Sequence, residues 1–199
     1  MLFHTDEVFF RLGNRYHWTF TRDLLARLEE HIPGASEHAH RVSKTATELS
    51  VAINIPFSLM RSISVGGLLH DIGKLHVSLL VVRQPPPWTA IYTKEMRKHV
   101  EYGADIISRS GFHQDVLDAV HYHHECWGGG GYPEGLSGED IPLIARIISV
   151  ADVWDALISE RSYKAKLTQD QALAEMTALE GGRFEPALVE QFVKMIRGE

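Results

Sequence analysis

The chain has 199 residues, long enough for one well-packed domain, and its 44% hydrophobic and 23% charged residues are ordinary for a globular protein. The formal net charge of −6 provides no basic surface for binding a nucleic acid polymer. The single cysteine, Cys126, excludes an internal disulfide and a zinc site built from several thiolates, which fits the reducing cytoplasm.

The sequence also gives no sign of a signal peptide or a membrane segment. Residues 1–4 lack the basic and then apolar order of a signal peptide. The most apolar stretch, 141–158, contains Arg146, Asp152 and Asp155, which is too much charge for a membrane span. We therefore expect a cytoplasmic protein with no membrane partner.

Apolar residues recur at helical spacing along most of the chain, and no stretch alternates as a β-strand does. This pattern predicts an all-α fold in one compact domain. Ser36 is the expected N-cap of one helix, and the adjacent Gly66 and Gly67 indicate a close contact between two helices. The predicted helices cover residues 21–31, 36–53, 56–71, 94–109, 113–125 and 142–158, and two more begin at Thr168 and Pro186.

Two segments between these helices are expected to be loops. Residues 75–94 contain three consecutive prolines, which a helix cannot accommodate, and are predicted to be a surface connection. Residues 126–140 contain four consecutive glycines and form a second, longer loop. We divide the chain into an N-terminal helical and aromatic extension, 1–35, and a main domain, 36–199.

Several histidines and aspartates fall on the inward faces of five predicted helices. A single histidine on an apolar face is more often a hydrogen-bonded core residue than a metal ligand. A larger set buried without partners would, however, cost several kcal/mol. Imidazole and carboxylate groups suit iron, manganese, zinc or nickel, and this number of ligands fits two ions sharing one carboxylate better than one catalytic ion. The seven candidate ligands are His38, His70, Asp71, His99, His123, His124 and Asp152.

The order of these residues, H…HD…H…HH…D, resembles that of the HD superfamily of metal-dependent phosphohydrolases. The run from His123 to Pro133 and the stretch 141–157 are similar to the signature of its HD-GYP branch. The resemblance covers about residues 36–197. It implies an HD-domain helical bundle with additional C-terminal helices. It also implies a phosphodiesterase that hydrolyses cyclic di-GMP or a related cyclic dinucleotide, with a signalling protein as a further partner.

The resemblance divides the seven ligands between two divalent transition metal ions, with iron or manganese preferred over zinc or nickel. Asp71 bridges the two ions, and Gly34, four residues before His38, offers no ligand for a third. A water between the ions would become the hydroxide that attacks phosphorus. The first ion is also held by His38, His70 and Asp152, and the second by His99, His123 and His124.

Four further side chains are expected to act on the substrate. Lys74 follows the His-Asp pair closely enough to stabilise charge on a phosphate, which makes it a catalytic residue with Asp71. The family pattern places Arg161 and Lys164 on the substrate phosphates, and Tyr132 shapes the loop beside the site. The alternative for each cation is a solvated side chain near a helix end.

Two residues depart from the family pattern. Gly128 stands where the loop usually has aspartate, and Cys126 where a basic or polar residue is common. We expect Gly128 to loosen the loop and slow turnover while metal binding survives. Two alternative functions therefore remain: a catalytically weak cyclic dinucleotide-binding or interaction module, and a general HD-type nucleotide phosphohydrolase.

Overall fold

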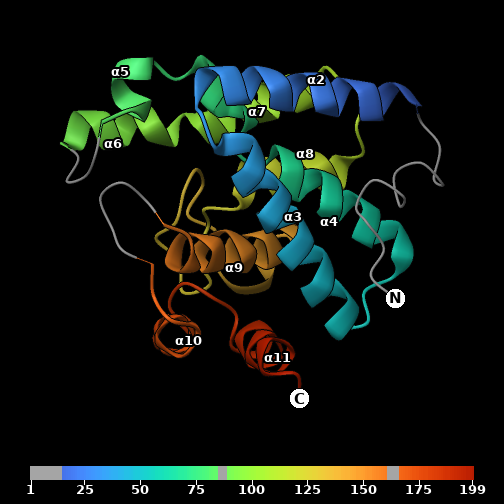
Figure 1. The fold of residues 1–199 in the computed structure, drawn as a ribbon, viewed down its shortest axis with the longest axis vertical. Helices are drawn as coiled ribbons and strands as arrows, with labels where there is room; N and C mark the ends of the chain where they lie inside the picture. Colours follow the sequence, from blue (N-terminus) through green and yellow to red (C-terminus); the bar gives the residue numbers. More distant parts are fainter. Residues whose placement is uncertain (1–14, 85–88, 161–165) are drawn as a thin grey trace.

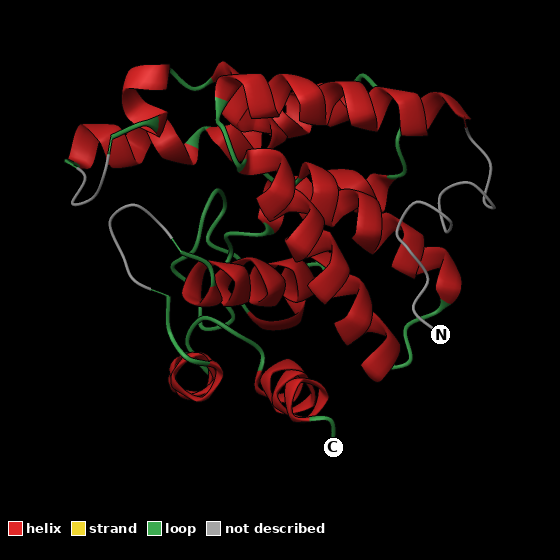
Figure 2. Cartoon of the chain, in the orientation of Figure 1, coloured by secondary structure: helices red, strands yellow, loops and turns green. Residues whose placement is uncertain are grey.

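The computed structural model describes residues 15–84, 89–160 and 166–199, and in these residues it contains helices and loops but no strand (Figure 2). The predicted all-α fold is therefore confirmed. The elements in chain order are α2 (Arg15–His31), α3 (Ala35–Ala52), α4 (Phe57–Leu69), the short 3-10 helix η1 (Ile72–His76), α5 (Leu79–Val82), α6 (Ala90–Arg97), α7 (His99–Ser108), α8 (Gln114–Tyr122), η2 (Gly138–Asp140), α9 (Leu143–Ile158), α10 (Gln169–Ala178) and α11 (Pro186–Arg197).

The helices bury two main apolar clusters on either side of the centre of the fold. The larger cluster joins α3 and α9 to the C-terminal helices α10 and α11, with Leu49, Ile148 and Phe192 fully buried. The smaller cluster joins α2 to α4 and α8 through residues such as Leu28 and Val120. In Figure 1, α2 lies at one end of the molecule and α10 and α11 lie at the other, with α9 between. The polar residues considered below lie between these two clusters.

The helix boundaries differ from the prediction in several places. The segment 75–94, predicted to be a loop, contains α5 and the start of α6, because only the part around its prolines is unable to form a helix. Helix α2 begins at Arg15 rather than at residue 21. The predicted helix 94–109 is divided into α6 and α7 at Lys98, whose N–H bonds to the carbonyl of Glu95 three residues back. The prediction that Ser36 caps α3 is wrong, because Gly34 is the N-cap residue. The Glu29 carboxylate of α2 instead accepts hydrogen bonds from the N–H groups of Gly34 and Ser36, at 2.8 and 2.9 Å.

The close helix contact predicted at Gly66 and Gly67 is confirmed. A Cβ atom added to Gly67 would lie 2.7 Å from Cα of Ser43 on α3, and one added to Gly66 would lie 2.6 Å from Cβ of Ala119 on α8. A Cβ on Gly73 of η1 would likewise collide with the backbone carbonyl of His99 on α7. These glycines bring α3, α4, η1, α7 and α8 close together where the candidate ligands lie.

The N-terminal boundary at residue 35 stays a prediction. Helix α2 packs on α3 and η1, and its residues Leu24, Leu25 and Leu28 are buried. Within the described part of the chain, no helix combines the length and the apolar character needed to cross a membrane.

The contact at Gly67 generates a stability prediction. Gly67→Ala should lower the free energy of unfolding by about 1–3 kcal/mol, because the new methyl group must push α3 away from α4. Urea denaturation would measure this change. Gly182→Ala is the matched control, since its Cβ would come no closer than 3.9 Å to a neighbour. Equal stability of the two variants would show that the α3–α4 contact is not tight.

Candidate metal centre

The seven predicted ligands meet between the two apolar clusters. His70 ends α4 and Asp71 precedes η1, so both enter from one turn of the chain. Helix α7 begins with His99, and His123 and His124 follow α8. Six of the seven ligands form two groups, in each of which the ligand atoms all lie within 4.8 Å of one another, and Asp71 belongs to both groups. The first group contains His38, His70 and Asp71, and the second contains Asp71, His99, His123 and His124.

The two oxygens of the Asp71 carboxylate face different groups. Oδ1 lies 3.5 Å from Nε2 of His99, whereas Oδ2 lies 3.5 Å from Nε2 of His70 and 3.8 Å from Nε2 of His38. Asp152 on α9 completes the first group, because its Oδ1 lies 3.3 Å from Nε2 of His38 and 3.9 Å from Nε2 of His70. The structure therefore places Asp71 between two sets of imidazole nitrogens.

Backbone carbonyls fix the orientation of three of the imidazole rings. Nδ1–H of His70, His99 and His123 donates to a carbonyl three residues earlier, at 2.8, 2.7 and 3.0 Å. Since a carbonyl only accepts, each ring carries its proton on Nδ1 and presents the lone pair of Nε2 to the centre. Nε2 of His70 is buried without a hydrogen-bond partner among the described residues. A buried acceptor of this kind fits a bound cation.

Burial sets the charge state of the second group. It lowers the pKa of His99 to about 4 and that of His124 to about 3, and it lowers the pKa of His123 well below its ordinary value. These rings are therefore neutral at pH 7 and able to bind a metal ion. Burial would raise the pKa of Asp71, but the nearby Lys74 ammonium opposes this effect, and the pKa lies well below its ordinary value. The ionised Asp71 carboxylate beside the three neutral imidazoles of the second group suits a divalent transition metal ion.

Asp155 contacts the candidate centre, although the sequence pattern did not assign it to the site. Its side chain is 2% exposed, and its Oδ2 accepts a hydrogen bond of 2.7 Å from Nδ1–H of His38. Arg41 and Ser159 donate to the same carboxylate. Burial disfavours the His38 imidazolium, but hydrogen bonds to Asp152 and Asp155 raise the pKa of His38 to about 9. In the sequence, the position of Asp155 one helical turn after Asp152 could have indicated that it lies near the site.

The remaining candidate residues lie around the centre. Lys74 donates a short hydrogen bond from Nζ to Oδ2 of Asp71. The ring of Tyr132 stacks on His124, with 4.7 Å between centroids and 23° between planes. Arg161 and Lys164 lie outside the described residues.

Backbone hydrogen bonds anchor the loop at Gly128, and the slower turnover expected from this glycine stays a prediction. Gly128 N–H donates to the carbonyl of Gly182 at 2.7 Å, and Trp127 N–H donates to that of Arg183 at 3.0 Å. The buried carboxylate of Glu125 accepts N–H bonds from residues 134 and 135 further along the same loop. A Cβ on Gly128 would lie 3.0 Å from the carbonyl oxygen of Gly181. The missing side chain therefore allows two loops to pack closely, and an aspartate would push them apart.

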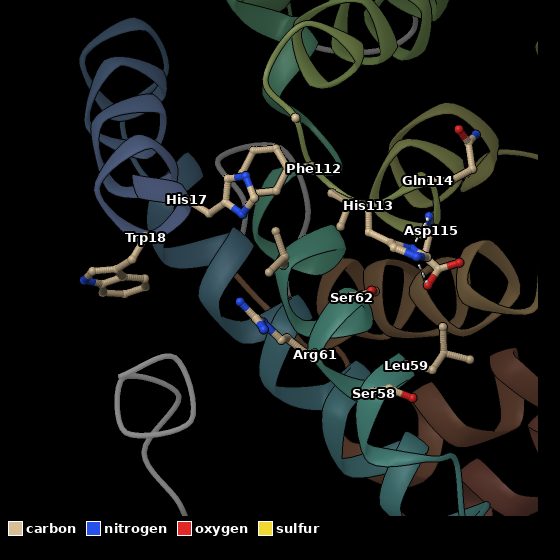
Figure 3. A pocket seen from close by; sticks show the side chains of 13 residues that line it. His17, Trp18, Ser58, Leu59, Arg61, Ser62, Phe112, His113, Gln114 and Asp115 are labelled. Carbon is tan, nitrogen blue, oxygen red and sulfur yellow. Dashed lines mark hydrogen bonds and ion pairs between the residues drawn. The ribbon is translucent and has the colours of Figure 1, made fainter. Parts of the chain in front are cut away.

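A cavity of about 890 Å³ lies away from this centre, between α2, α4 and the start of α8 (Figure 3). His17, Arg61 and Phe112 line it. None of the seven candidate ligands borders this cavity. The candidate metal centre is therefore located by its ligand side chains and not by this cavity.

Comparison with known proteins identifies the class of this fold and site. The sequence model of the HD domain matches residues 23–188, so the chain belongs to the HD-domain family. An HDG"Y"P protein from Bdellovibrio bacteriovorus has a similar structure, with a TM-score of 0.69 and 24% identity over 82% of this chain and 53% of that one.

Two relatives are named for their activities. A 3′3′-cGAMP-specific phosphodiesterase 2 from Vibrio cholerae is 39% identical over 77% of this chain and 30% of its own length. The cyclic di-GMP phosphodiesterase response regulator RpfG from Xanthomonas campestris is 36% identical over 87% of this chain and 47% of its own length. The chain thus spans less than half the length of each relative.

The contact between His38 and Asp155 generates a prediction about metal affinity. Asp155→Asn should weaken metal binding by about 10- to 100-fold, because it removes the charge that orients and polarises His38. Metal titration by calorimetry would measure this. Asp105→Asn is the matched control, since Asp105 is an exposed carboxylate paired with Arg109. Unchanged affinity in Asp155→Asn would contradict the role of Asp155.

The pKa shifts predict that the metal-free protein is most stable near pH 6.5. Below this pH, His99 and His124 become protonated in the unfolded chain, whereas in the folded chain they stay neutral until about pH 4 and pH 3. The unfolded chain therefore binds more protons, and the stability of the fold decreases as the pH falls. Above it, folded His38 keeps a proton that the unfolded chain loses, so stability falls as the pH rises through about 9. Urea denaturation in a chelator between pH 4 and 9 tests this. A continuous increase in stability toward pH 4 would contradict it.

Proposed function

We propose that the chain is a metal-dependent phosphodiesterase that hydrolyses a cyclic dinucleotide, namely cyclic di-GMP or a related one such as 3′3′-cGAMP. The observation that carries the proposal is the position of Asp71, whose two carboxylate oxygens face two separate sets of imidazole nitrogens. Such a shared carboxylate is suited to hold two cations at the spacing used for phosphodiester hydrolysis.

In this proposal two divalent ions are bound, with iron or manganese preferred over zinc or nickel. His38, His70 and Asp152 would hold one ion, His99, His123 and His124 would hold the other, and Asp71 would contact both. The ions, when bound, would supply Lewis acidity and an activated water at neutral pH. Imidazole and carboxylate donors without a thiolate suit all four of these metals, and the resemblance to the HD-GYP branch gives the preference for iron or manganese.

The chain itself supplies orientation and charge. The carbonyls of Gly67, Met96 and Val120 hold three rings with Nε2 directed inward. The Lys74 ammonium, hydrogen-bonded to Asp71 and partly exposed, is positioned to neutralise charge that develops on a phosphate. Tyr132 forms a wall of the site through its stack on His124. Arg161 and Lys164 are proposed to bind substrate phosphates.

The relatives support the substrate class and a role in signalling. Both curated relatives are named as phosphodiesterases of cyclic dinucleotides, and one is also named as a response regulator. A signalling-protein partner is therefore part of the proposal. The well-anchored loop at Gly128 favours an active enzyme over a catalytically weak binding module.

The test combines metal analysis with hydrolysis assays on one anaerobically purified sample. The wild type should contain about two metal ions per chain and should hydrolyse cyclic di-GMP or 3′3′-cGAMP but not a nucleoside triphosphate. Asp71→Ala should lose metal and at least about a hundredfold in activity, because it removes the shared ligand. Asp105→Ala, at an exposed carboxylate, should lose neither. Full metal content and activity in Asp71→Ala would refute the proposal.

A further inference from the structure

A hollow of about 550 Å³ opens between α6 and the loop that carries Tyr132. We call it the α6 groove. In a chain with a net charge of −6, it has an excess of positive charge, since three cations and one carboxylate, that of Glu101, line it. Such a local excess attracts anions. The three cations are Lys94, Arg97 and Lys98.

Tyr132 joins this groove to the candidate metal centre. Its ring stacks on His124, and its centroid lies 6.5 Å from that of His99. The guanidinium carbon of Arg97 lies 4.8 Å from the same centroid, over the ring. One aromatic side chain therefore contacts two candidate metal ligands and a cation of the groove, so the groove lies next to the centre.

Two of the three cations are available for a ligand. Lys98 is already paired, because its Nζ lies 2.8 Å from the carboxylate of Glu95. Neither Lys94 nor Arg97 has a carboxylate partner in the ranges that the structure describes, and both are exposed. Arg97 also presents a planar fork of donors, which matches two phosphate oxygens.

We propose that the α6 groove binds the phosphate of the cyclic dinucleotide that is not being hydrolysed, with Arg97 as its main ligand and Lys94 in support. The proposal rests on the proposed function. A cyclic dinucleotide has two phosphodiester groups on opposite sides of one ring, so when one is at the metal centre the other must lie to the side. The groove supplies positive charge at such a position.

The groove would make the enzyme selective for substrates with two phosphates. A diester with a single phosphate reaches the metal centre but has no group for Arg97 to bind. Loss of Arg97 should therefore change the ratio of kcat/KM for a cyclic dinucleotide to kcat/KM for a simple diester, whereas general damage to the site would lower both values together.

The experiment uses the full chain loaded with Mn²⁺ and three single variants. Arg97→Ala removes the main cation of the groove, and Glu101→Gln removes its carboxylate. Arg109→Ala is the control, because Arg109 is exposed, paired with Asp105 and outside the groove. Calorimetry gives the Kd of a slowly hydrolysed phosphorothioate analogue of cyclic di-GMP. Steady-state assays give kcat/KM for cyclic di-GMP and for bis(p-nitrophenyl) phosphate.

Arg97→Ala should raise the Kd and lower the ratio of the two kcat/KM values by about tenfold or more, the usual effect of losing a charged hydrogen bond. Glu101→Gln should lower the Kd by about twofold, and Arg109→Ala should change neither quantity. Two variants in one groove with opposite effects on affinity are not explained by misfolding.

Four results would contradict the proposal or its basis. An unchanged Kd in Arg97→Ala, or an equal loss on both substrates, would refute the groove while leaving the phosphodiesterase intact. Binding of the analogue by a wild type that hydrolyses neither substrate would refute the proposed function, and the Kd values of the variants would then decide on the groove alone. Absence of binding to the wild type would refute both.

Discussion

The buried carboxylate of Asp71 is the constraint on which the rest of the structure depends. An ionised carboxylate that is 6% exposed is costly unless opposite charges or hydrogen bonds compensate it. Lys74 supplies one compensating charge, and the imidazole groups of the candidate ligands surround the rest of the carboxylate. The close approach of η1 to α7 at Gly73 brings His99 beside Asp71. The close contact of α3 with α4 at Gly67 likewise accompanies the position of His38 near Asp71. The position of the polar side chains around Asp71 therefore depends on the close packing of the helices.

The residues around the centre fall into two sets, those held by hydrogen bonds within the protein and those that a substrate can reach. Ring orientations depend on backbone carbonyls within or next to helices, and the orientation of His38 depends on Asp155, which Arg41 holds in turn. These contacts do not involve a substrate. Lys74, Tyr132 and Arg97 lie further out, where a ligand can reach them. This arrangement fixes the chemistry in the helical core and leaves recognition to the surface around it.

Helical periodicity was sufficient to predict the fold class, and it indicated that His70 and Asp152 lie next to apolar residues of their own helices. Contacts between distant segments could not be predicted in this way. The role of Asp155 depends on His38, 117 residues earlier, and the close packing of Gly128 depends on the carbonyls of Gly181 and Gly182. The α6 groove is likewise formed by a helix and a loop that no local pattern connects.

The central claim is that Asp71 is shared by two metal ions. Anomalous X-ray diffraction from crystals of the Mn²⁺-loaded protein tests it most directly. Two anomalous peaks about 3.5–4 Å apart are expected, one next to each oxygen of the Asp71 carboxylate. A single ion, or two ions of which only one contacts Asp71, would contradict it.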